Sequence, residues 1–392
     1  MNSGIMNRRD ALKTSLAAPL FVPQSAFGAN DRITYGMIAV GGRGRYLNQK
    51  FSTQGNQCIA VCDVYKPNIE RALKDTPQAK TFGNYEELLA MKGLDAVVIA
   101  SPDHHHCPML LAALKAGKDA YLEKPLSKSL EESRRMIAAV RNSDRIVQIG
   151  MQRRSAPAIM KAKKLLDDGA LGRISLVRPQ WFWNVAKPLN NTPLEGEINW
   201  KGFLGAAYHR PIEPMRFRSW RYFFDYAGGN MTDQGTHLMD VVQWFMGVTG
   251  PKSAVSQGFV AKMTGAEHPD VFSATFGYEG FLVNWTLDYG NAYQNGWSIA
   301  FHGDKGTLIL DDNGFRLYAE PWKKGVAPAL EEESPVPVEA HVQNFTDCMR
   351  SRKQPNCPVE IAAQAVSGPH LANLAMFRER KVYLAEDGVT VS

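Results

Sequence analysis

Short apolar runs alternate with amphipathic segments through the first 150 residues. The apolar runs lie at residues 33–40, 57–62, 79–82, 96–100, 120–122 and 146–149, and helical patterns separate them at 46–51, 67–74, 85–91, 108–116 and 130–142. A continuous apolar run such as 96–100 is typical of a strand that is buried on both faces. Strict alternation of strand and helix predicts a doubly wound α/β domain with a parallel sheet, ending near Gly150.

The pattern changes after Gly150. Strand-like stretches follow one another with glycine-rich turns and little helix between them, at 174–183, 254–262, 273–278, 282–289, 298–302 and 306–310. Such a series predicts a meandering sheet, and helical patterns at 340–350 and 360–379 close the chain. We therefore predict two domains of class α/β, a nucleotide-binding domain over residues 30–150 and a substrate and oligomerisation domain over residues 151–392.

Composition and charge exclude several classes of protein. A hydrophobic fraction of 44% and a charged fraction of 21% are ordinary for a globular protein. The formal net charge of +6 is mild, and no block of lysine and arginine supports nucleic-acid binding. The five cysteines have no framework spacing, although Cys348 and Cys357 could pair in an oxidising compartment.

The first 28 residues have the three regions of an export signal. Arg8 and Arg9 stand in a basic start, an apolar stretch follows at 16–22, and small residues end the segment at 26–28. A twin arginine in this order predicts export through the Tat machinery to the periplasm, whereas the alternative is a disordered basic tail. The apolar stretch is too short to span a bilayer, so we expect no membrane segment after cleavage.

A glycine turn follows the first predicted strand. It consists of Gly41, Gly42, Arg43 and Gly44. Between a strand and a helix, such a turn lets backbone N–H groups approach a pyrophosphate at the helix N-terminus. Ala39 occupies the place of the first glycine of the dinucleotide fingerprint, which weakens the motif taken alone.

Asp63 strengthens the prediction of a dinucleotide site. It ends the second predicted strand, 22 residues after Gly41, where a carboxylate accepts hydrogen bonds from the adenosine ribose. An acidic residue there favours NAD, while the nearby Lys66 leaves NADP open. The alternative role for Asp63 is that of a helix cap or a turn residue.

Polar residues follow two further strands at the same edge of the sheet, where ligands of open α/β sheets bind. Ser101, Asp103 and His104 come after strand 96–100, and we expect them to face the cofactor. Three adjacent histidines cannot all point at one ion, so no metal site is predicted at 104–106.

Glu123 and Lys124 follow strand 120–122, and we expect both to lie beside the cofactor. At this edge a lysine is placed to polarise a substrate oxygen. Taken alone, Glu-Lys-Pro is also common in surface turns.

Asp233 and His237 precede an apolar helical run. Because they are four residues apart, we expect them on one helical face, with the carboxylate orienting the imidazole. Histidine suits a general base because its unperturbed pKa lies near working pH. The alternative is that Asp233 caps the helix and His237 is a core residue.

Aromatic and basic residues in the second half suggest a sugar site. Trp181, Trp183, Arg218 and Trp220 lie in segments that could line the cleft. Aromatic faces stack on the C–H faces of sugars and arginines bind hydroxyls or carboxylates, whereas the alternative is core and interface packing.

Taken together, these motifs resemble the Gfo/Idh/MocA oxidoreductases, in the family order and over nearly all of the chain after residue 28. The resemblance implies a Rossmann domain followed by an α/β domain with a large, mostly antiparallel open sheet, and a homo-oligomer. It assigns proton acceptance to His237, oxyanion stabilisation to Lys124 and orientation of its neighbours to Asp233. Ala39 departs from the commonest family pattern and leaves the pyrophosphate contacts open.

Export and a nicotinamide cofactor together narrow the expected chemistry. Free NAD(P) is not expected outside the cytoplasm, so the cofactor should be tightly bound and regenerated within its own site. The favoured hypothesis is that the protein is an exported NAD(P)-dependent oxidoreductase that acts on a sugar or polyol. The alternative is a redox-neutral glycoside hydrolase that oxidises its substrate transiently, although such relatives typically lack the lysine found here as Lys124. A non-enzymatic sugar-binding module would predict a blocked site.

Overall fold

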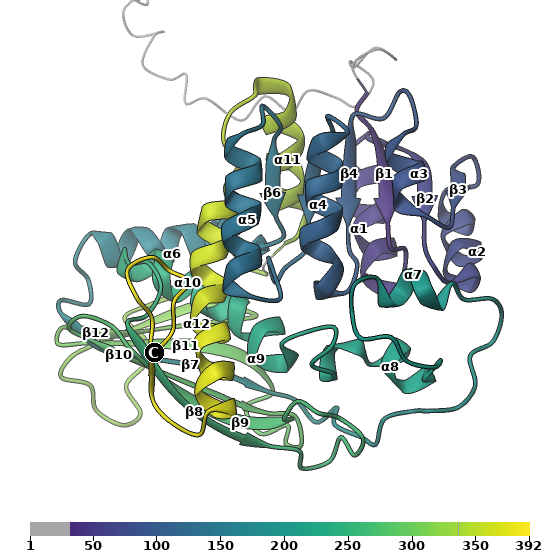
Figure 1. Ribbon diagram of the computed structural model, residues 1–392. Helices are drawn as coiled ribbons and strands as arrows, with labels where there is room; N and C mark the ends of the chain where they lie inside the picture. Colours follow the sequence, from purple (N-terminus) through teal and green to yellow (C-terminus); the bar gives the residue numbers. More distant parts are fainter. Residues whose placement is uncertain (1–31, 336) are drawn as a thin grey trace, which may run out of the picture. The chain divides into compact units, whose positions relative to one another are not determined.

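The computed structural model describes residues 32–335 and 337–392, so the proposed export signal at 1–28 lies outside the described residues. The first part of the described chain forms a six-stranded parallel sheet (Figure 1). Its strand order is β3-β2-β1-β4-β5-β6, with β1 (Thr34–Ile38), β2 (Gln57–Cys62), β3 (Lys80–Phe82), β4 (Ala96–Ile99), β5 (Asp119–Leu122) and β6 (Val147–Ile149). This is the order of dinucleotide-binding sheets, and it confirms the predicted doubly wound domain.

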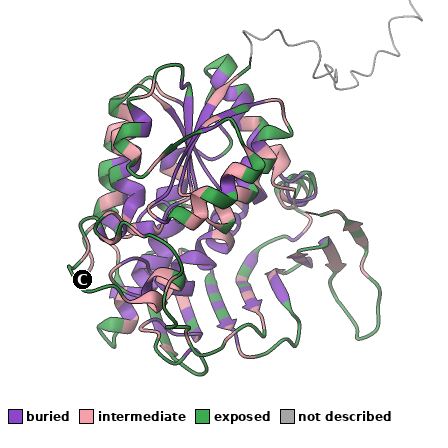
Figure 2. Cartoon of the chain, turned by 90° about the vertical axis from the view of Figure 1, so that its right-hand side faces the viewer, coloured by how far each residue is buried: buried purple, intermediate pink, exposed green. Residues whose placement is uncertain are grey.

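Helices cover both faces of this sheet, and most residues of its strands are buried (Figure 2). They are α1 (Gly42–Ser52), α2 (Lys66–Asp75), α3 (Tyr85–Leu89), α4 (His106–Lys115) and α5 (Leu130–Arg141). Local sequence sets several of their ends: the Ser129 side chain accepts a hydrogen bond from the Glu132 N–H at the start of α5, which satisfies a donor that the helix itself leaves free. All four residues of β4 are buried, as the continuous apolar run predicts.

The second sheet has nine strands in the order β14-β13-β12-β11-β7-β10-β9-β8-β15. The strands are β7 (Ile174–Phe182), β8 (Ser253–Phe259), β9 (Val271–Gly277), β10 (Leu282–Asp288), β11 (Gly296–Gly303), β12 (Gly306–Asp311), β13 (Gly314–Ala319), β14 (Leu330–Glu333) and β15 (Val382–Tyr383). All pairs are antiparallel except β7 with β10. The predicted open sheet is confirmed, and β13, β14 and β15 extend it beyond the strands that the sequence pattern indicates.

Helices of the second half lie along one face of this sheet and beside the first domain. They are α6 (Pro157–Asp167), α7 (Trp200–Leu204), α8 (Pro214–Arg218), α9 (Gly229–Asp233), α10 (Gly235–Met246), α11 (Glu339–Ser351) and α12 (Val359–Phe377). On α10, Phe245 stacks on Phe301 of the sheet, with ring centroids 5.1 Å apart. Alternate residues of the strands are therefore buried against helices, while the others face outward (Figure 2).

The last two helices join the domains into one body. On α11, Phe345 packs against Phe51 and Tyr121 of the first domain, with ring centroids 6.1 and 5.8 Å apart. The first half of α12 is buried with the parallel sheet and its second half with the nine-stranded sheet (Figure 1). Although these helices follow the second sheet in sequence, the core of the first domain is completed only by α11 and α12.

The described residues contain no helix that is long and apolar enough to cross a membrane. All five cysteines are free, so Cys348 and Cys357 do not pair. The Cys348 thiol instead donates to the carbonyl oxygen of Gln354, and Cys357 is fully buried in the core around the parallel sheet.

Candidate active site

The glycine turn lies between β1 and α1, at the carboxyl edge of the parallel sheet. Gly44 must lack a side chain, because a Cβ there would lie 2.1 Å from the carbonyl oxygen of Ala39. Ala39 itself has a φ of 66°, the left-handed conformation that glycine adopts in the usual fingerprint. The alanine therefore keeps the backbone path of the turn.

A cavity of about 690 Å³ extends from this turn along the edge of the sheet. Gly41, Asp63 and Ser101 are among its lining residues. The Asp63 carboxylate accepts hydrogen bonds from the N–H groups of Val40 and Tyr65, both at 2.9 Å. Asp63 thus has two roles, since it holds the turn together and presents its buried carboxylate to the cavity.

The structure places Asp103 and His104 outside the lining of the cavity. Neither is among the residues that line the two cavities of this edge. The His104 ring nitrogen Nε2 is 2.8 Å from the carbonyl oxygen of Phe203. Burial and the nearby Asp233 carboxylate raise the pKa of Asp103 to about 8. Ser101 lines the predicted cofactor cleft. The side chains of Asp103 and His104 do not face this cleft, so the structure does not show the contact predicted for them.

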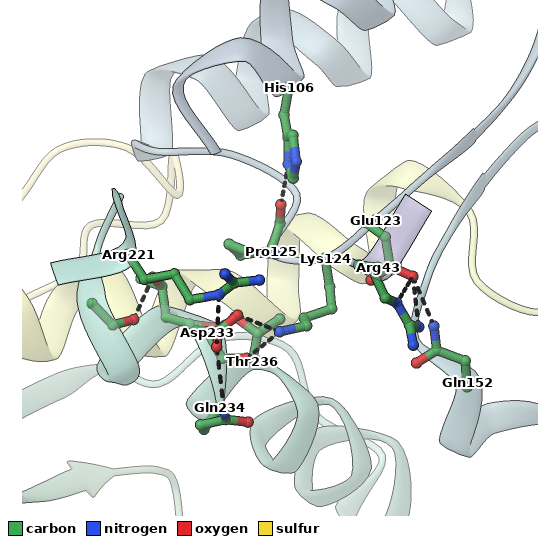
Figure 3. Close-up of polar contacts among 12 residues, drawn as sticks. Arg43, His106, Glu123, Lys124, Pro125, Gln152, Arg221, Asp233, Gln234 and Thr236 are labelled. Atoms are coloured by element: carbon green, nitrogen blue, oxygen red, sulfur yellow. Dashed lines mark hydrogen bonds and ion pairs between the residues drawn. The ribbon is translucent and has the colours of Figure 1, made fainter. Parts of the chain in front are cut away.

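Lys124 and Asp233 meet across the domain boundary (Figure 3). The Lys124 Nζ lies 2.5 Å from Asp233 Oδ1 and 2.9 Å from the Asp233 carbonyl oxygen. Arg221 adds an ion pair at 3.4 Å to the other carboxylate oxygen. Burial alone would raise the pKa of Asp233, but Lys124 and Arg221 outweigh it and lower this pKa to about 2. Asp233 is therefore an anion that fixes the position of Lys124.

Glu123 is held by a second network next to Lys124 (Figure 3). Its Oε1 accepts hydrogen bonds from Arg43 Nε at 2.9 Å, from Arg43 Nη2 at 2.7 Å and from Gln152 Nε2 at 3.1 Å. The arginine of the glycine turn is thus tied to the Glu-Lys-Pro segment. The His106 ring nitrogen Nδ1 lies 2.7 Å from the Pro125 carbonyl oxygen, and Nε2 lies 3.0 Å from the Ser101 carbonyl oxygen. The imidazole therefore joins the loops that follow β4 and β5.

The predicted orientation of His237 by Asp233 is wrong. α9 ends at Asp233 and α10 begins at Gly235, so the two residues lie on different helices and share no helical face. Within residues 32–335 and 337–392, no hydrogen bond joins them. The Asp233 carboxylate is turned to Lys124 and Arg221 instead, while the His237 ring lies 6.4 Å from the ring of Trp181.

His237 nevertheless belongs to the same site. It lines a second cavity of about 330 Å³ together with Lys124 and Asp233. Burial, followed by the positive charges of Arg153 and Lys124, lowers the pKa of His237 well below its usual value. The imidazole is therefore neutral at physiological pH and available as a proton acceptor.

The four residues predicted for the substrate site divide between the cavities, and Trp220 lines both. Trp181, Trp183 and Trp220 line the 330 Å³ cavity, as expected for a substrate site. Arg218 lines the larger cavity and donates a 2.9 Å hydrogen bond to the Pro193 carbonyl oxygen. Arg218 therefore does not line the smaller cavity, where it was predicted to bind the substrate.

Sequence reasoning missed several residues of the smaller cavity. They are Gln152, Arg153, Gln234, Trp297 and Asp312. Gln152 and Arg153 follow β6, another strand of the parallel sheet, so the rule that located Lys124 also indicates this segment. Trp297 and Asp312 come from β11 and the turn after β12, and no local signal distinguishes them.

Comparison with known families identifies the chain. A model of the oxidoreductase family with an NAD-binding Rossmann fold matches residues 33–151, and the Gfo/Idh/MocA C-terminal domain matches residues 159–309. The chain belongs to the Gfo/Idh/MocA oxidoreductase family. Among the described residues, no group of histidine, cysteine and carboxylate side chains is arranged to hold a metal ion.

Curated relatives in this family match part of the chain. Scyllo-inositol 2-dehydrogenase (NAD(+)) of Bacillus subtilis is 29% identical over 213 residues, 54% of this chain and 53% of that protein. Levoglucosan dehydrogenase of Pseudarthrobacter phenanthrenivorans is 32% identical over 165 residues, 41% of this chain and 35% of that protein. The chain spans about half the length of the first of these relatives.

Solved structures of the family share the whole fold. A levoglucosan dehydrogenase in complex with NADH has a TM-score of 0.72 and 17% identity, over 90% of this chain and 99% of that one. The Gfo/Idh/MocA architecture therefore extends through both domains of the described chain.

Proposed function

We propose that this protein is an NAD(P)-dependent dehydrogenase that oxidises a hydroxyl group of a sugar or cyclic polyol. One observation carries the proposal: Lys124, Asp233 and His237 line one cavity, which shares Ser101 and Trp220 with the cleft beside the glycine turn. A proton acceptor and a cation for a developing oxyanion thus stand next to the dinucleotide site.

The residues of the larger cavity fit a dinucleotide. Gly41 and the N-terminus of α1 would hold the pyrophosphate, and the Asp63 carboxylate would accept the ribose hydroxyls. The close approach at Gly44 shows that the turn is built for tight helix packing. When bound, NAD(P) supplies the acceptor for a hydride.

Three side chains of the smaller cavity accept the proton, stabilise the oxyanion and position the cation. Neutral His237 accepts the proton of the substrate hydroxyl as the carbon becomes a carbonyl. The Lys124 ammonium donates to the same oxygen and stabilises its negative charge. Asp233 keeps Lys124 in place through two contacts and remains anionic throughout.

The aromatic lining supports a carbohydrate substrate. Trp181, Trp183 and Trp220 offer ring faces against which the C–H groups of a sugar can pack. Relatives named for inositol and levoglucosan oxidation act on compounds of this class.

We further propose that the protein is exported through the Tat route and carries a tightly bound cofactor. The support is the twin arginine at Arg8 and Arg9, followed by an apolar stretch and small residues. An exported dehydrogenase without a free cofactor pool must close its redox cycle in one site.

A homo-oligomer is also proposed, formed through the outward face of the nine-stranded sheet. The support is the exposure of large apolar side chains there, at 45% for Val255 and 50% for Leu282. Light scattering of the purified protein measures the number of subunits, and a monomer at micromolar concentration contradicts this part of the proposal.

The first experiment analyses the cofactor that is released on denaturation. Absorbance and mass identify NAD(H) or NADP(H), and the intact protein is then offered free sugars, inositols and nitrophenyl glycosides. A change in the redox state of the cofactor with a free sugar or inositol supports the dehydrogenase. Release of nitrophenol without net redox change identifies the redox-neutral glycosidase instead.

A further inference from the structure

Four cationic side chains line the smaller cavity, and they differ in their partners. They are Arg43, Lys124, Arg153 and Arg221. Three are paired with carboxylates: Arg43 with Glu123 at 2.7 Å, and Lys124 and Arg221 with Asp233 at 2.5 and 3.4 Å. The Arg153 side chain forms no hydrogen bond and no ion pair with any residue of the described chain.

Arg153 is nevertheless buried, with 8% of its surface exposed. Its guanidinium lies over the ring of Trp297, 4.1 Å from the ring centroid, and 5.5 Å from that of Trp181. The Nε is buried without an acceptor. Burial lowers the pKa of Arg153 to about 10, so the side chain remains charged at neutral pH. A buried charge without a partner is costly, and a ligand that pairs with it offsets this cost.

The charged side chains that line the cavity have a net positive charge, which favours an anionic ligand. Against the four cations stand three carboxylates, Glu123, Asp233 and Asp312, while His237 is neutral. Asp312 does not neutralise Arg153 by direct contact, because its Oδ1 accepts a hydrogen bond from Trp297 Nε1 and it forms no ion pair with Arg153 among the described residues. The Asp312 and Asp240 carboxylates raise the pKa of Arg153 from a distance, but neither forms an ion pair with it among the described residues, and Asp240 is paired with Arg154 at 2.7 Å. One positive charge is therefore in excess, and it is centred on Arg153.

We propose that Arg153 binds a carboxylate of the substrate, and that the substrate class is sugars bearing a carboxylate, of which uronic acids are the simplest. This inference rests on the dehydrogenase function proposed above. A planar guanidinium offers two parallel N–H donors that match the two oxygens of a carboxylate. The indole rings that hold the guanidinium also bound the space where the sugar ring would lie.

The size of the cavity is consistent with a small acidic sugar. At about 330 Å³ it lies at the lower end of ligand pockets, roughly 300–1,000 Å³. A guanidinium also binds a phosphate through two N–H donors, so a sugar phosphate is the competing anion. The single excess positive charge of the cavity matches the single negative charge of a carboxylate better than the charge of a phosphate monoester, which is about −1.5 to −2 at pH 7. The experiment distinguishes these two anions.

The test compares acidic sugars with their neutral parents. The substrates are D-glucuronate and D-galacturonate, D-glucose and D-galactose, and D-glucose 6-phosphate, with kcat/KM measured on the protein loaded with NAD(P). We expect the uronates to exceed their parents by about 10–100-fold, the ratio given by a hydrogen-bonded charge. Arg153→Gln should abolish this ratio by lowering kcat/KM for the uronates far more than for the neutral sugars, and Arg153→Lys should retain part of it. Arg173→Gln removes an exposed charge at the start of β7 and should leave the ratio unchanged.

Binding is measured separately by the quenching of tryptophan fluorescence, because four tryptophans line the cavity. Equal kcat/KM for acidic and neutral sugars, or equal losses for both in Arg153→Gln, overturns the carboxylate site while leaving the dehydrogenase in place. A preference for the 6-phosphate overturns it as well. Uronate binding that weakens about 10–100-fold in Arg153→Gln, with no change in the cofactor's redox state for any sugar, supports the carboxylate site and overturns the dehydrogenase.

Discussion

Lys124 Nζ donates to both the Oδ1 and the carbonyl oxygen of Asp233, at 2.5 and 2.9 Å. The pair joins the loop after β5, in the parallel sheet, to the end of α9, in the second half of the chain. Both side chains are about nine-tenths buried. The cation that is needed at the substrate oxygen is thus fixed before any substrate arrives, which is the preorganisation that makes electrostatic catalysis effective.

Asp233→Asn should lower kcat by about 100-fold, because the amide keeps the shape of the side chain but removes the charge that holds Lys124. The affinity for NAD(P) should stay unchanged, because Asp233 does not line the nucleotide cleft. Steady-state kinetics and cofactor titration measure the two effects. In the double variant with Lys124→Ala the losses should not add, and additive losses would contradict a shared role for the pair.

Lys124→Ala and His237→Ala should each reduce turnover by about 10²–10⁴-fold and leave the cofactor bound. Both residues line the substrate cavity and neither lines the nucleotide cleft. Turnover is followed by absorbance of the reduced cofactor, and bound cofactor is quantified after denaturation. Full activity in either variant removes the role assigned to that residue.

The break at Gln234 explains why the sequence misplaced the partner of His237. A spacing of four residues implies a shared face only if the helix is continuous, and here α9 ends at Asp233 before α10 begins at Gly235. The residues themselves were predictable, because glycines and a polar stretch precede an apolar helix. Their mutual geometry was not predictable, because the Asp233 carboxylate turns to Lys124, which is 109 positions from Asp233 in the chain.

The fold was more predictable than the composition of the cavity. Period-two and buried apolar patterns are local, and they located β1 to β12 closely. The place of α11 in the first domain depends on Phe345 packing against Phe51, a contact between distant parts of the chain. Arg153 was missed for a related reason, since an arginine is normally exposed and nothing local shows that Trp297 covers it.

Gly44→Ala should destabilise the protein by about 1–3 kcal/mol or more, because the new Cβ would lie 2.1 Å from the carbonyl oxygen of Ala39 and force α1 away from β1. Gly42→Ala is the matched control, since a Cβ there has no neighbour within 4 Å and the change removes flexibility from the unfolded chain. Thermal unfolding without cofactor should show a lower midpoint for Gly44→Ala alone. Equal midpoints would mean that the turn tolerates a side chain at both positions.

Asp63→Ser should weaken NAD binding by about 10–100-fold, because a buried carboxylate that faces the nucleotide cleft is lost. The affinity for NADP should fall less, or rise, since the carboxylate would repel a 2′-phosphate. Calorimetric titration with both cofactors gives the ratio. An unchanged ratio would assign Asp63 to the turn alone, through its bonds to Val40 and Tyr65.

The fall of kcat/KM at low pH, the acid limb of the pH profile, should reflect the protonation of His237. Burial, then Arg153, Lys124, Arg43 and His341, lower the pKa of its imidazole well below the usual value. The base form is neutral, so kcat/KM should hold as pH falls through 6.5 and decline only below the lowered pKa.

Arg153→Gln removes the charge that lowers the pKa of His237 most, and it should move the acid limb to higher pH. A neutral sugar is the substrate for this measurement, so that the loss of a carboxylate contact does not enter. Arg173→Gln should leave the limb in place, because the exposed start of β7 does not face the imidazole. An acid limb that is the same in Arg153→Gln and in the original protein would mean that another group accepts the proton, because a base that Arg153 faces must become more basic when that charge is removed.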